Sequence, residues 1–245
     1  MSVVEMLILV GLVVFITHTL EAITGFGCTV LALPFVIFLM KDLEQAKIIL
    51  TIIAWLLALY FAITKFKRIN WKQFGIIILF AGIGLPVGML LFKSLDAAIL
   101  KKILGYFIIL SAAIQLYKIF IPQAKIGSLP DFTGYIFLLA GGIIHGAFAA
   151  GGPLVVLYST RKIPDKGQFR ATMCLLWTTL NTLLIIQYFF EKKLNLETGR
   201  NLLFLLPFLV AGIITGEIIH NKVNEILFKK IVFLSLFLVG IAMII

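Results

Sequence analysis

The chain has 245 residues, of which 62% are hydrophobic and 13% are charged, and its mean hydropathy is +1.14. An ordinary globular domain is about half apolar and about a quarter charged, so this composition excludes a soluble protein. Lys and Arg outnumber Asp and Glu by 21 to 11, but they stand in short clusters between apolar segments. This pattern predicts loops that face lipid headgroups, and no nucleic-acid partner.

In chain order, the apolar segments predict an all-α polytopic membrane protein. No Lys or Arg precedes the first segment, so we expect it to be kept as a membrane segment and not cleaved as a signal peptide. A bilayer core about 30 Å thick needs about 20 apolar residues in a helix. Six windows each fit one span: 46–64, 73–92, 98–120, 167–190, 200–219 and 225–245.

Two further apolar windows, residues 3–40 and 132–160, are too long for one straight span. As helices they would measure about 57 Å and about 44 Å. The first contains Thr24-Gly25-Phe26-Gly27 and then Pro34; the second contains Gly141-Gly142 and, at 149–153, Ala-Ala-Gly-Gly-Pro. Glycine and proline interrupt helices, so we expect a break in each window. Backbone opened at membrane depth persists only inside protein or beside a wet cavity, which makes both breaks candidate sites.

The long windows begin two similar halves, residues 1–120 and 132–245, joined by a linker over residues 121–131. His18 precedes Gly25 by seven residues, as His145 precedes Gly152. A Gly-x-x-x-Gly pair at positions 84 and 88 returns at 212 and 216, each followed thirteen residues on by Lys-Lys. The ordered series predicts an internal duplication, and the glycine pairs predict close helix packing.

The topology of the two copies depends on how each long window crosses the membrane. If each window is a hairpin that returns to its starting side, a half crosses an odd number of times and the copies are inverted. If each crosses once, the copies are parallel. The hairpin topology places 13 Lys and Arg on one side of the membrane and 8 on the other, whereas the single-crossing topology places 12 and 9. The positive-inside rule therefore slightly favours the hairpins. We expect inverted repeats, each a Gly-rich broken helix or re-entrant hairpin followed by three transmembrane helices, with both termini outside.

Ionisable residues in the first long window are candidates for proton coupling. His18 and Glu21 lie three residues apart and share a helix face with Gly25. A charge inside a membrane is costly without a partner or water, so such residues are functional candidates. We expect His18, Glu21 and His145 to carry coupling, a proton being favoured over sodium. The alternatives are an interfacial location, a cation held by Glu21, or Glu21 capping the break by accepting N–H bonds.

The breaks also predict where a small anion binds, because half-helix N-termini present N–H groups and a positive dipole end. Expected substrate contacts are Thr24, Gly25, Phe26, Gly27, Gly151, Gly152 and Pro153. Lys47 and Arg170 open the spans after the two breaks and would add positive charge. Gln45, Gln168 and Asn181 would add neutral hydrogen bonds. Flanking charges and helix-to-helix contacts are the alternative roles of these five residues.

No soluble catalytic set, phosphate-binding motif or metal-ligand spacing stands out, so we expect no catalytic residue, metal or cofactor. A competing hypothesis is a membrane-embedded enzyme or redox partner built on His18, Glu21, Cys28 and His145. Another is a structural membrane subunit that needs a partner.

Three stretches resemble the TauE/SafE family of sulfite exporters and related anion transporters: His18-Thr-Leu-Glu21-x-x-Thr-Gly-Phe-Gly27, His145-Gly-x-x-x-Ala-Gly-Gly-Pro153, and Arg170-Ala-Thr172 to Asn181. The resemblance covers essentially the whole chain. It implies a secondary transporter in the cytoplasmic membrane that moves sulfite, sulfonates or related small anions, coupled to an ion gradient, and it allows a homo-oligomer. The matched spacing puts Phe148 where the first half has Glu21, so we do not expect two symmetric carboxylates.

Overall fold

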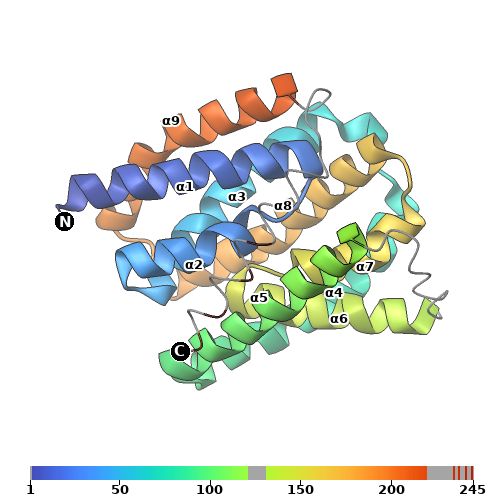
Figure 1. Cartoon of the computed structure of the whole chain (residues 1–245), viewed down its shortest axis with the longest axis horizontal. Coiled ribbons are helices and arrows are strands. Elements are labelled where there is room, and N and C mark those ends of the chain that lie inside the picture. The colour runs from blue at the N-terminus through green and yellow to red at the C-terminus, as the bar shows by residue number, and fades with distance from the viewer. Residues whose placement is uncertain are drawn as a thin grey trace.

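The computed structural model describes residues 2–120 and 131–219, together with positions 234, 237, 241 and 244. The two long stretches fold entirely as helices and turns, without a strand (Figure 1). The helices are α1 (Val3–Thr24), α2 (Cys28–Met40), α3 (Leu43–Thr64), the 3-10 helix η1 (Phe66–Arg68), α4 (Trp71–Ser94), α5 (Ala97–Phe120), α6 (Asp131–Phe148), α7 (Gly152–Lys162), α8 (Lys166–Phe190) and α9 (Leu196–Ile219).

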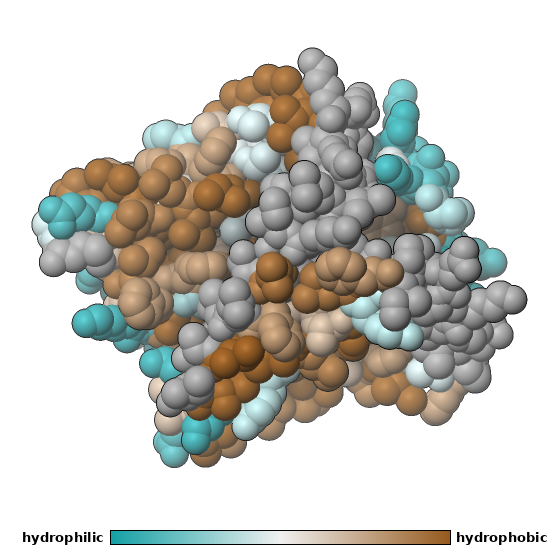
Figure 2. Space-filling view, viewed as in Figure 1, coloured by the Kyte–Doolittle hydropathy of each residue, from teal (hydrophilic) through white to brown (hydrophobic). Residues whose placement is uncertain are grey.

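Six helices of the described stretches are long and apolar enough to cross a membrane: α1, α3, α4, the first part of α5, α8 and α9. Five of them match predicted windows, and α1 is the first arm of a predicted broken window. The window 225–245 lies almost wholly outside the described residues. On the face in Figure 2, hydrophilic side chains lie mainly toward the left and right edges, and the coloured surface between them is mostly apolar. The prediction of an all-α polytopic membrane protein is confirmed.

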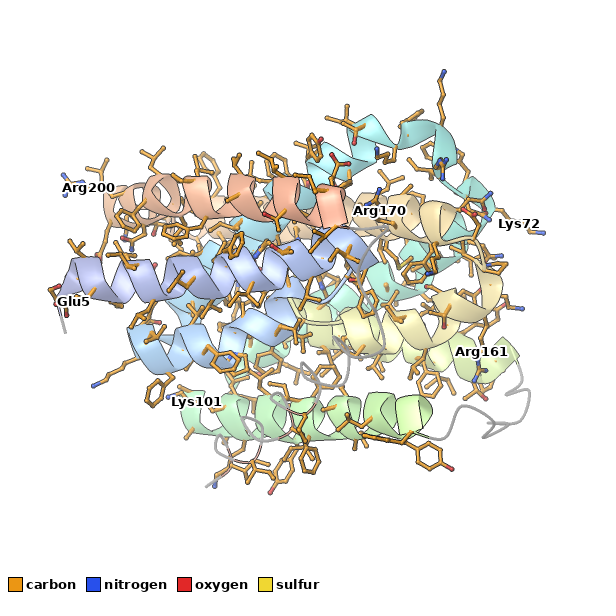
Figure 3. The ribbon with its side chains drawn as sticks, turned by 45° about the horizontal axis from the view of Figure 1, so that its top comes forward. Glu5, Lys72, Lys101, Arg161, Arg170 and Arg200 are labelled. Atoms are coloured by element: carbon orange, nitrogen blue, oxygen red, sulfur yellow. The ribbon has the colours of Figure 1, made fainter. Side chains whose placement is uncertain are left out.

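The labelled residues near the ends of five helices show the ends of the molecule at which these helices start or finish. Glu5, Lys101 and Arg200, near the starts of α1, α5 and α9, lie toward one end of the molecule, and Lys72 of α4 and Arg161 of α7 lie at the other (Figure 3). In Figure 1, α2 runs back alongside α1 toward the end where α1 began, and α7 returns beside α6 in the same way. These are the directions expected of two hairpins. The inverted repeat itself stays a prediction.

Close helix packing brings the two halves together through glycine. A Cβ added to Gly88 of α4 would lie 1.9 Å from the Ile143 carbonyl oxygen of α6. One added to Gly216 of α9 would lie 2.4 Å from the Ala22 side chain of α1. Glycine is required at both places because the backbones leave no room for a side chain. The packing role predicted for the Gly-x-x-x-Gly pairs is confirmed.

The observed helix ends align the two halves differently from the histidine spacing in the sequence. Helix α1 ends at Thr24 and α6 at Phe148, while α2 begins at Cys28 and α7 at Gly152, so both pairs lie 124 residues apart. The histidine spacing had aligned the halves 127 residues apart. The two alignments differ by about one helical turn because the matched glycines lie at different points of the two breaks. Gly25 directly follows α1, whereas Gly152 is the first residue of α7.

An ion-pair network ties the end of α8 to α3 and α4. Glu191 accepts hydrogen bonds from Lys93 and from Gln187, and Lys193 pairs with Glu191 at 3.3 Å and with Glu44. Partial burial alone would raise the pKa of the Glu191 carboxyl, but the hydrogen bonds from Lys93, Gln187 and Lys193 outweigh it and hold that pKa below its ordinary value.

Candidate functional site

The first break lies between α1 and α2, as predicted. Gly25 and Gly27 adopt φ values of +83° and +105°, a left-handed region that other residues rarely occupy. The Gly25 N–H closes the end of α1 on the Glu21 carbonyl at 2.7 Å. The Thr24 hydroxyl donates to the Phe26 carbonyl at 2.9 Å and steadies the loop. A Cβ at Gly25 would lie 2.8 Å from the Arg170 backbone, so α8 passes directly beside this break.

The second break lies at Ala149–Gly151, between α6 and α7. Ala149 has a φ of +54°, and its N–H bonds the His145 carbonyl at 2.6 Å, as Gly25 does with Glu21. The sequence offered Gly141-Gly142 as another possible position for this break, but α6 continues through both residues without interruption. A Cβ at Gly142 would meet the Ala81 carbonyl oxygen at 2.0 Å, so Gly142 allows α4 to pack against an unbroken α6, whereas Gly141 faces Val155 of α7.

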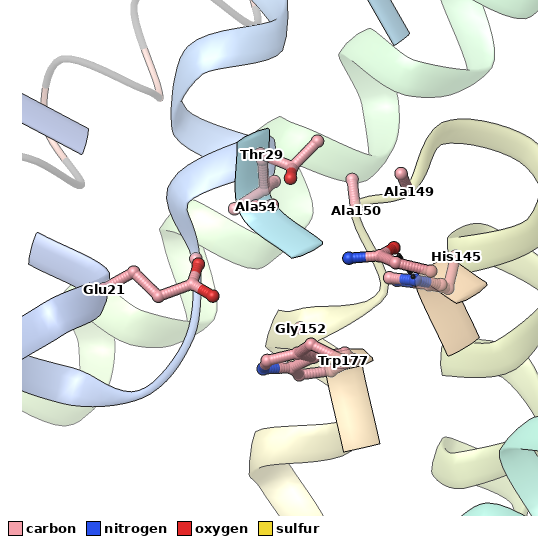
Figure 4. A pocket seen from close by; sticks show the side chains of 11 residues that line it. Glu21, Thr29, Ala54, His145, Ala149, Ala150, Gly152 and Trp177 are labelled. Carbon is pink, nitrogen blue, oxygen red and sulfur yellow. Dashed lines mark hydrogen bonds between the residues drawn. The ribbon is translucent and has the colours of Figure 1, made fainter. Parts of the chain in front are cut away.

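The two breaks, remote in sequence, meet in space. An ideal Cβ at Gly152 would lie 3.8 Å from the Gly27 nitrogen and 3.7 Å from the Phe26 ring. Beside this contact is a small cavity of about 20 Å³, with room for about one water-sized group (Figure 4). Its walls are Glu21, Gly27, Thr29, Val30, Ala54, His145, Ala149, Ala150, Gly152, Trp177 and Asn181.

Glu21 forms one wall of the cavity. Its side chain is 3% exposed, and Oε2 accepts the Cys28 N–H, the first of α2, at 2.8 Å. This is the capping contact considered from the sequence, and it places a carboxylate at the N-terminal end of α2, where the helix dipole favours negative charge. His18 is turned to other partners, since its Nδ1 lies 2.9 Å from the Val14 carbonyl oxygen.

His145 faces Glu21 from the opposite wall, beside Trp177 (Figure 4). Its Nε2 lies 2.9 Å from Oδ1 of Asn181. Because an amide oxygen only accepts, Nε2 carries the hydrogen, and the buried Nδ1 has no hydrogen-bond partner within the described stretches. Trp177 stacks on the imidazole with ring centroids 5.3 Å apart, and its Nε1–H donates to the Gly25 carbonyl at 3.0 Å. One indole therefore touches both breaks.

With the helix ends aligned, His145 corresponds to Glu21. The sequence spacing had given that place to Phe148, and this assignment is corrected because α6 ends at Phe148, where α1 ends at Thr24. The two halves thus place a carboxylate and an imidazole at equivalent positions, one turn before each break. The cavity has one acidic wall and one wall of neutral hydrogen-bonding groups.

Lys47 and Arg170 are buried behind the cavity and are not among its lining residues. The Lys47 ammonium donates to the Gly146 carbonyl at 2.9 Å, and Nη1 of Arg170 donates to the Ala22 carbonyl at 2.8 Å. These carbonyls belong to the residues that directly follow His145 and Glu21. Both cations therefore lie close to the breaks, and their donor groups point to backbone.

Apart from Lys47 and Arg170, the predicted substrate contacts divide into three groups. Gly27, Gly152 and Asn181 line the cavity; Thr24, Gly25, Phe26, Gly151 and Pro153 belong to the breaks but not to the lining. Gln45 and Gln168 make contacts between helices: Oε1 of Gln45 accepts from Thr198 at 3.3 Å, and Oε1 of Gln168 accepts from Asn70 at 3.4 Å. These are the helix-to-helix contacts named as the alternative.

Trp177 is the main lining residue that the sequence reasoning missed. A signal for it was present on α8, since Arg170, Cys174, Trp177 and Asn181 recur at helical spacing and share one face. The aliphatic lining of Val30, Ala54 and Ala150 carries no comparable signal, because small apolar residues are common throughout the chain.

Comparison with known proteins identifies the family. The family described as "Sulfite exporter TauE/SafE" matches residues 9–243. The chain belongs to this family. Among curated proteins, it is similar to "Probable inner membrane transporter protein TsaS" of Comamonas testosteroni, with 23% identity over 154 residues. That alignment covers 62% of the chain and 63% of the relative. No solved structure matches the chain. The TauE/SafE membership and the six apolar spans make the chain a multi-pass protein of the cell membrane.

Proposed function

We propose that this TauE/SafE member is a secondary transporter that carries small anions, such as sulfite or sulfonates, through the cavity between the two breaks. The observation that carries the proposal is the meeting of both breaks at one cavity with polar groups on facing walls. Transporters of this general construction bind substrate where broken helices of two halves meet. The family match and the relative named as a transporter give independent support.

Buried charge favours an anion as the substrate. Among the described residues, the buried ionic side chains are Glu21, Lys47 and Arg170, which sum to +1 when the histidines are neutral. Charges interact strongly in an interior of low dielectric constant, so a net positive surrounding stabilises a monovalent anion. Lys47 and Arg170 contribute this charge from behind the wall, without contacting the anion.

The neutral wall supplies the contacts to the anion. The bond to His145 uses Oδ1 of Asn181, so the amide NH2 is the part left to donate toward a ligand. The N-terminus of α7 follows Gly151, which has no side chain to cap it. The N-terminus of α2, in contrast, already binds the Glu21 carboxylate. An anion in this cavity therefore binds beside His145, Asn181 and the start of α7.

Glu21 couples proton and anion through its position on the facing wall. An ionised carboxylate repels an anion in the same cavity, and a protonated one does not. Anion binding and protonation of Glu21 therefore favour each other, which produces symport of one proton with one anion. His145, across the cavity, is the second proton-binding group of this scheme. His18 lies on α1 outside the cavity lining and contacts the Val14 carbonyl of the same helix.

Alternating access follows from the pairing of the two halves. The broken helix α1 packs against α9, and α6 packs against α4, so each half holds the broken helix of the other. A rocking motion of one half against the other would open the cavity to each side in turn.

Counterflow of labelled sulfite in proteoliposomes of the purified protein tests the proposal. We expect exchange by the wild type, loss of exchange in Asn181→Leu, and retention in Leu183→Ala, a matched control on the exposed face of the same helix. Methanesulfonate in excess should compete. The absence of exchange and of competition by either anion in folded wild-type protein would refute an anion transporter of this class.

A further inference from the structure

Buried cationic side chains bond the last-turn carbonyls of α1 and α6 in the same way. The last four carbonyls of a helix lack intrahelical partners, and inside a membrane no bulk water satisfies them. In α1, the Glu21 carbonyl accepts from Gly25 N–H and the next carbonyl, that of Ala22, accepts from Arg170. In α6, the His145 carbonyl accepts from Ala149 N–H and the next carbonyl, that of Gly146, accepts from Lys47. Two helix ends 124 residues apart are thus completed by the same pair of contacts.

These contacts cross between the halves in a reciprocal manner. Lys47, on α3 of the first half, holds the end of α6 in the second, and Arg170, on α8 of the second half, holds the end of α1 in the first. Each cation also lies over an aromatic ring: Lys47 Nζ is 3.9 Å from the centroid of Phe92, and the Arg170 guanidinium is 4.7 Å from that of Phe61. A carbonyl and a ring face together stabilise a cation that is away from water.

We infer that Lys47 and Arg170 are positioning residues that hold the two breaks against the cavity, each acting on the opposite half. The carbonyls they bind directly follow His145 and Glu21, so the donors fix the last turn that carries each polar wall. This role differs from the direct substrate contact expected from the sequence. Its importance for transport rests on the proposed function, but the geometry it predicts can be measured without a substrate.

Amide hydrogen exchange on the full chain in lipid nanodiscs tests the inference. In Lys47→Met, we expect exchange to rise about tenfold or more in peptides covering residues 145–155, with little change over residues 21–31. In Arg170→Met, we expect the reverse. Lys47→Arg and Arg170→Lys keep a charged donor and should restore most of the protection. Lys72→Met, at an exposed position on α4, is the matched control.

The crossed pattern separates positioning from general loosening. A rise in both segments in each methionine variant, or in neither, would overturn the inference, as would failure of the conservative variants to restore protection. If a methionine variant does not fold, Lys47→Gln and Arg170→Gln, which keep a shorter neutral donor, must give the same crossed pattern. Sulfite counterflow is measured on the same preparations. If the wild type does not transport sulfite but the variants give the crossed exchange pattern, only the proposed function is contradicted. If the wild type transports sulfite and the crossed pattern is absent, only the inference is contradicted.

Discussion

Replacing Glu21 by Gln separates its capping contact from its proposed role in coupling. Gln has nearly the same shape, and its amide oxygen can accept the Cys28 N–H that Oε2 of Glu21 now accepts at 2.8 Å. A hydrogen bond to a charged group contributes about 1.5–3 kcal/mol and one between neutral groups about 0.5–1.5 kcal/mol, so the substitution should lower stability by about 1 kcal/mol. Glu21→Leu removes the acceptor, and the buried Cys28 N–H left unpaired should cost a further 1–3 kcal/mol or so.

Accumulation in proteoliposomes under an imposed pH difference measures the coupling. With one proton carried per monovalent anion, a difference of one pH unit supports about tenfold accumulation of labelled methanesulfonate, whose charge stays −1 at both pH values, because each tenfold ratio corresponds to about 1.4 kcal/mol. We expect wild-type protein to approach this ratio. Glu21→Gln should still exchange methanesulfonate but should bring its internal and external concentrations only to equality. Accumulation by Glu21→Gln driven by the pH difference alone would refute the role of Glu21 in coupling and leave only the cap.

Three further predictions concern packing, pH dependence and binding. Gly88→Ala should lower the unfolding temperature in detergent by several degrees, because its Cβ has no space; Gly82→Ala on the same helix, with nothing within 4 Å of the added Cβ, should leave it unchanged or raise it slightly. The lowered pKa of Glu191 means that its contribution to stability is present above its ordinary pKa of 4.5 and is lost as the pH falls through the lower folded-state value; Glu191→Gln should remove that part of the acid sensitivity in pH-dependent unfolding. Asn181→Leu should weaken equilibrium binding of labelled sulfite at least about tenfold, while Leu183→Ala keeps wild-type affinity.

The helices and the existence of both breaks could be predicted from the sequence because they follow from local chemistry. Apolar length gives the spans, and Gly25 and Gly27 supply backbone angles that other residues rarely adopt. The position of the second break was less certain, since Gly141-Gly142 and Gly151-Gly152 are equally plausible in sequence. Tertiary packing accounts for the first pair: Gly142 faces the backbone of α4 and Gly141 faces Gly151 and Val155, so both glycines allow close packing within an unbroken α6.

The site was predictable in outline and not in its pairings. Glu21, His145 and Asn181 stood out because polar groups are costly at membrane depth. Which of them share a cavity depends on how α6 and α8 pack, so the sequence favoured the near neighbour His18 as the partner of Glu21, whereas His145 lies across the cavity from it. The charge of Lys47 was equally visible, but its bond to a distant carbonyl depends on tertiary structure alone.

Fluorescence of Trp177 during titration with sulfite tests most directly the central claim that an anion binds between the two breaks. In Trp55→Phe/Trp71→Phe protein, Trp177 is the remaining tryptophan, and it lines the cavity while contacting His145 and the Gly25 carbonyl. We expect a saturable change in its emission with sulfite or methanesulfonate, and no such change when Asn181→Leu is added. Saturable binding of labelled sulfite to the same protein with unchanged Trp177 emission would place the site elsewhere and contradict the account.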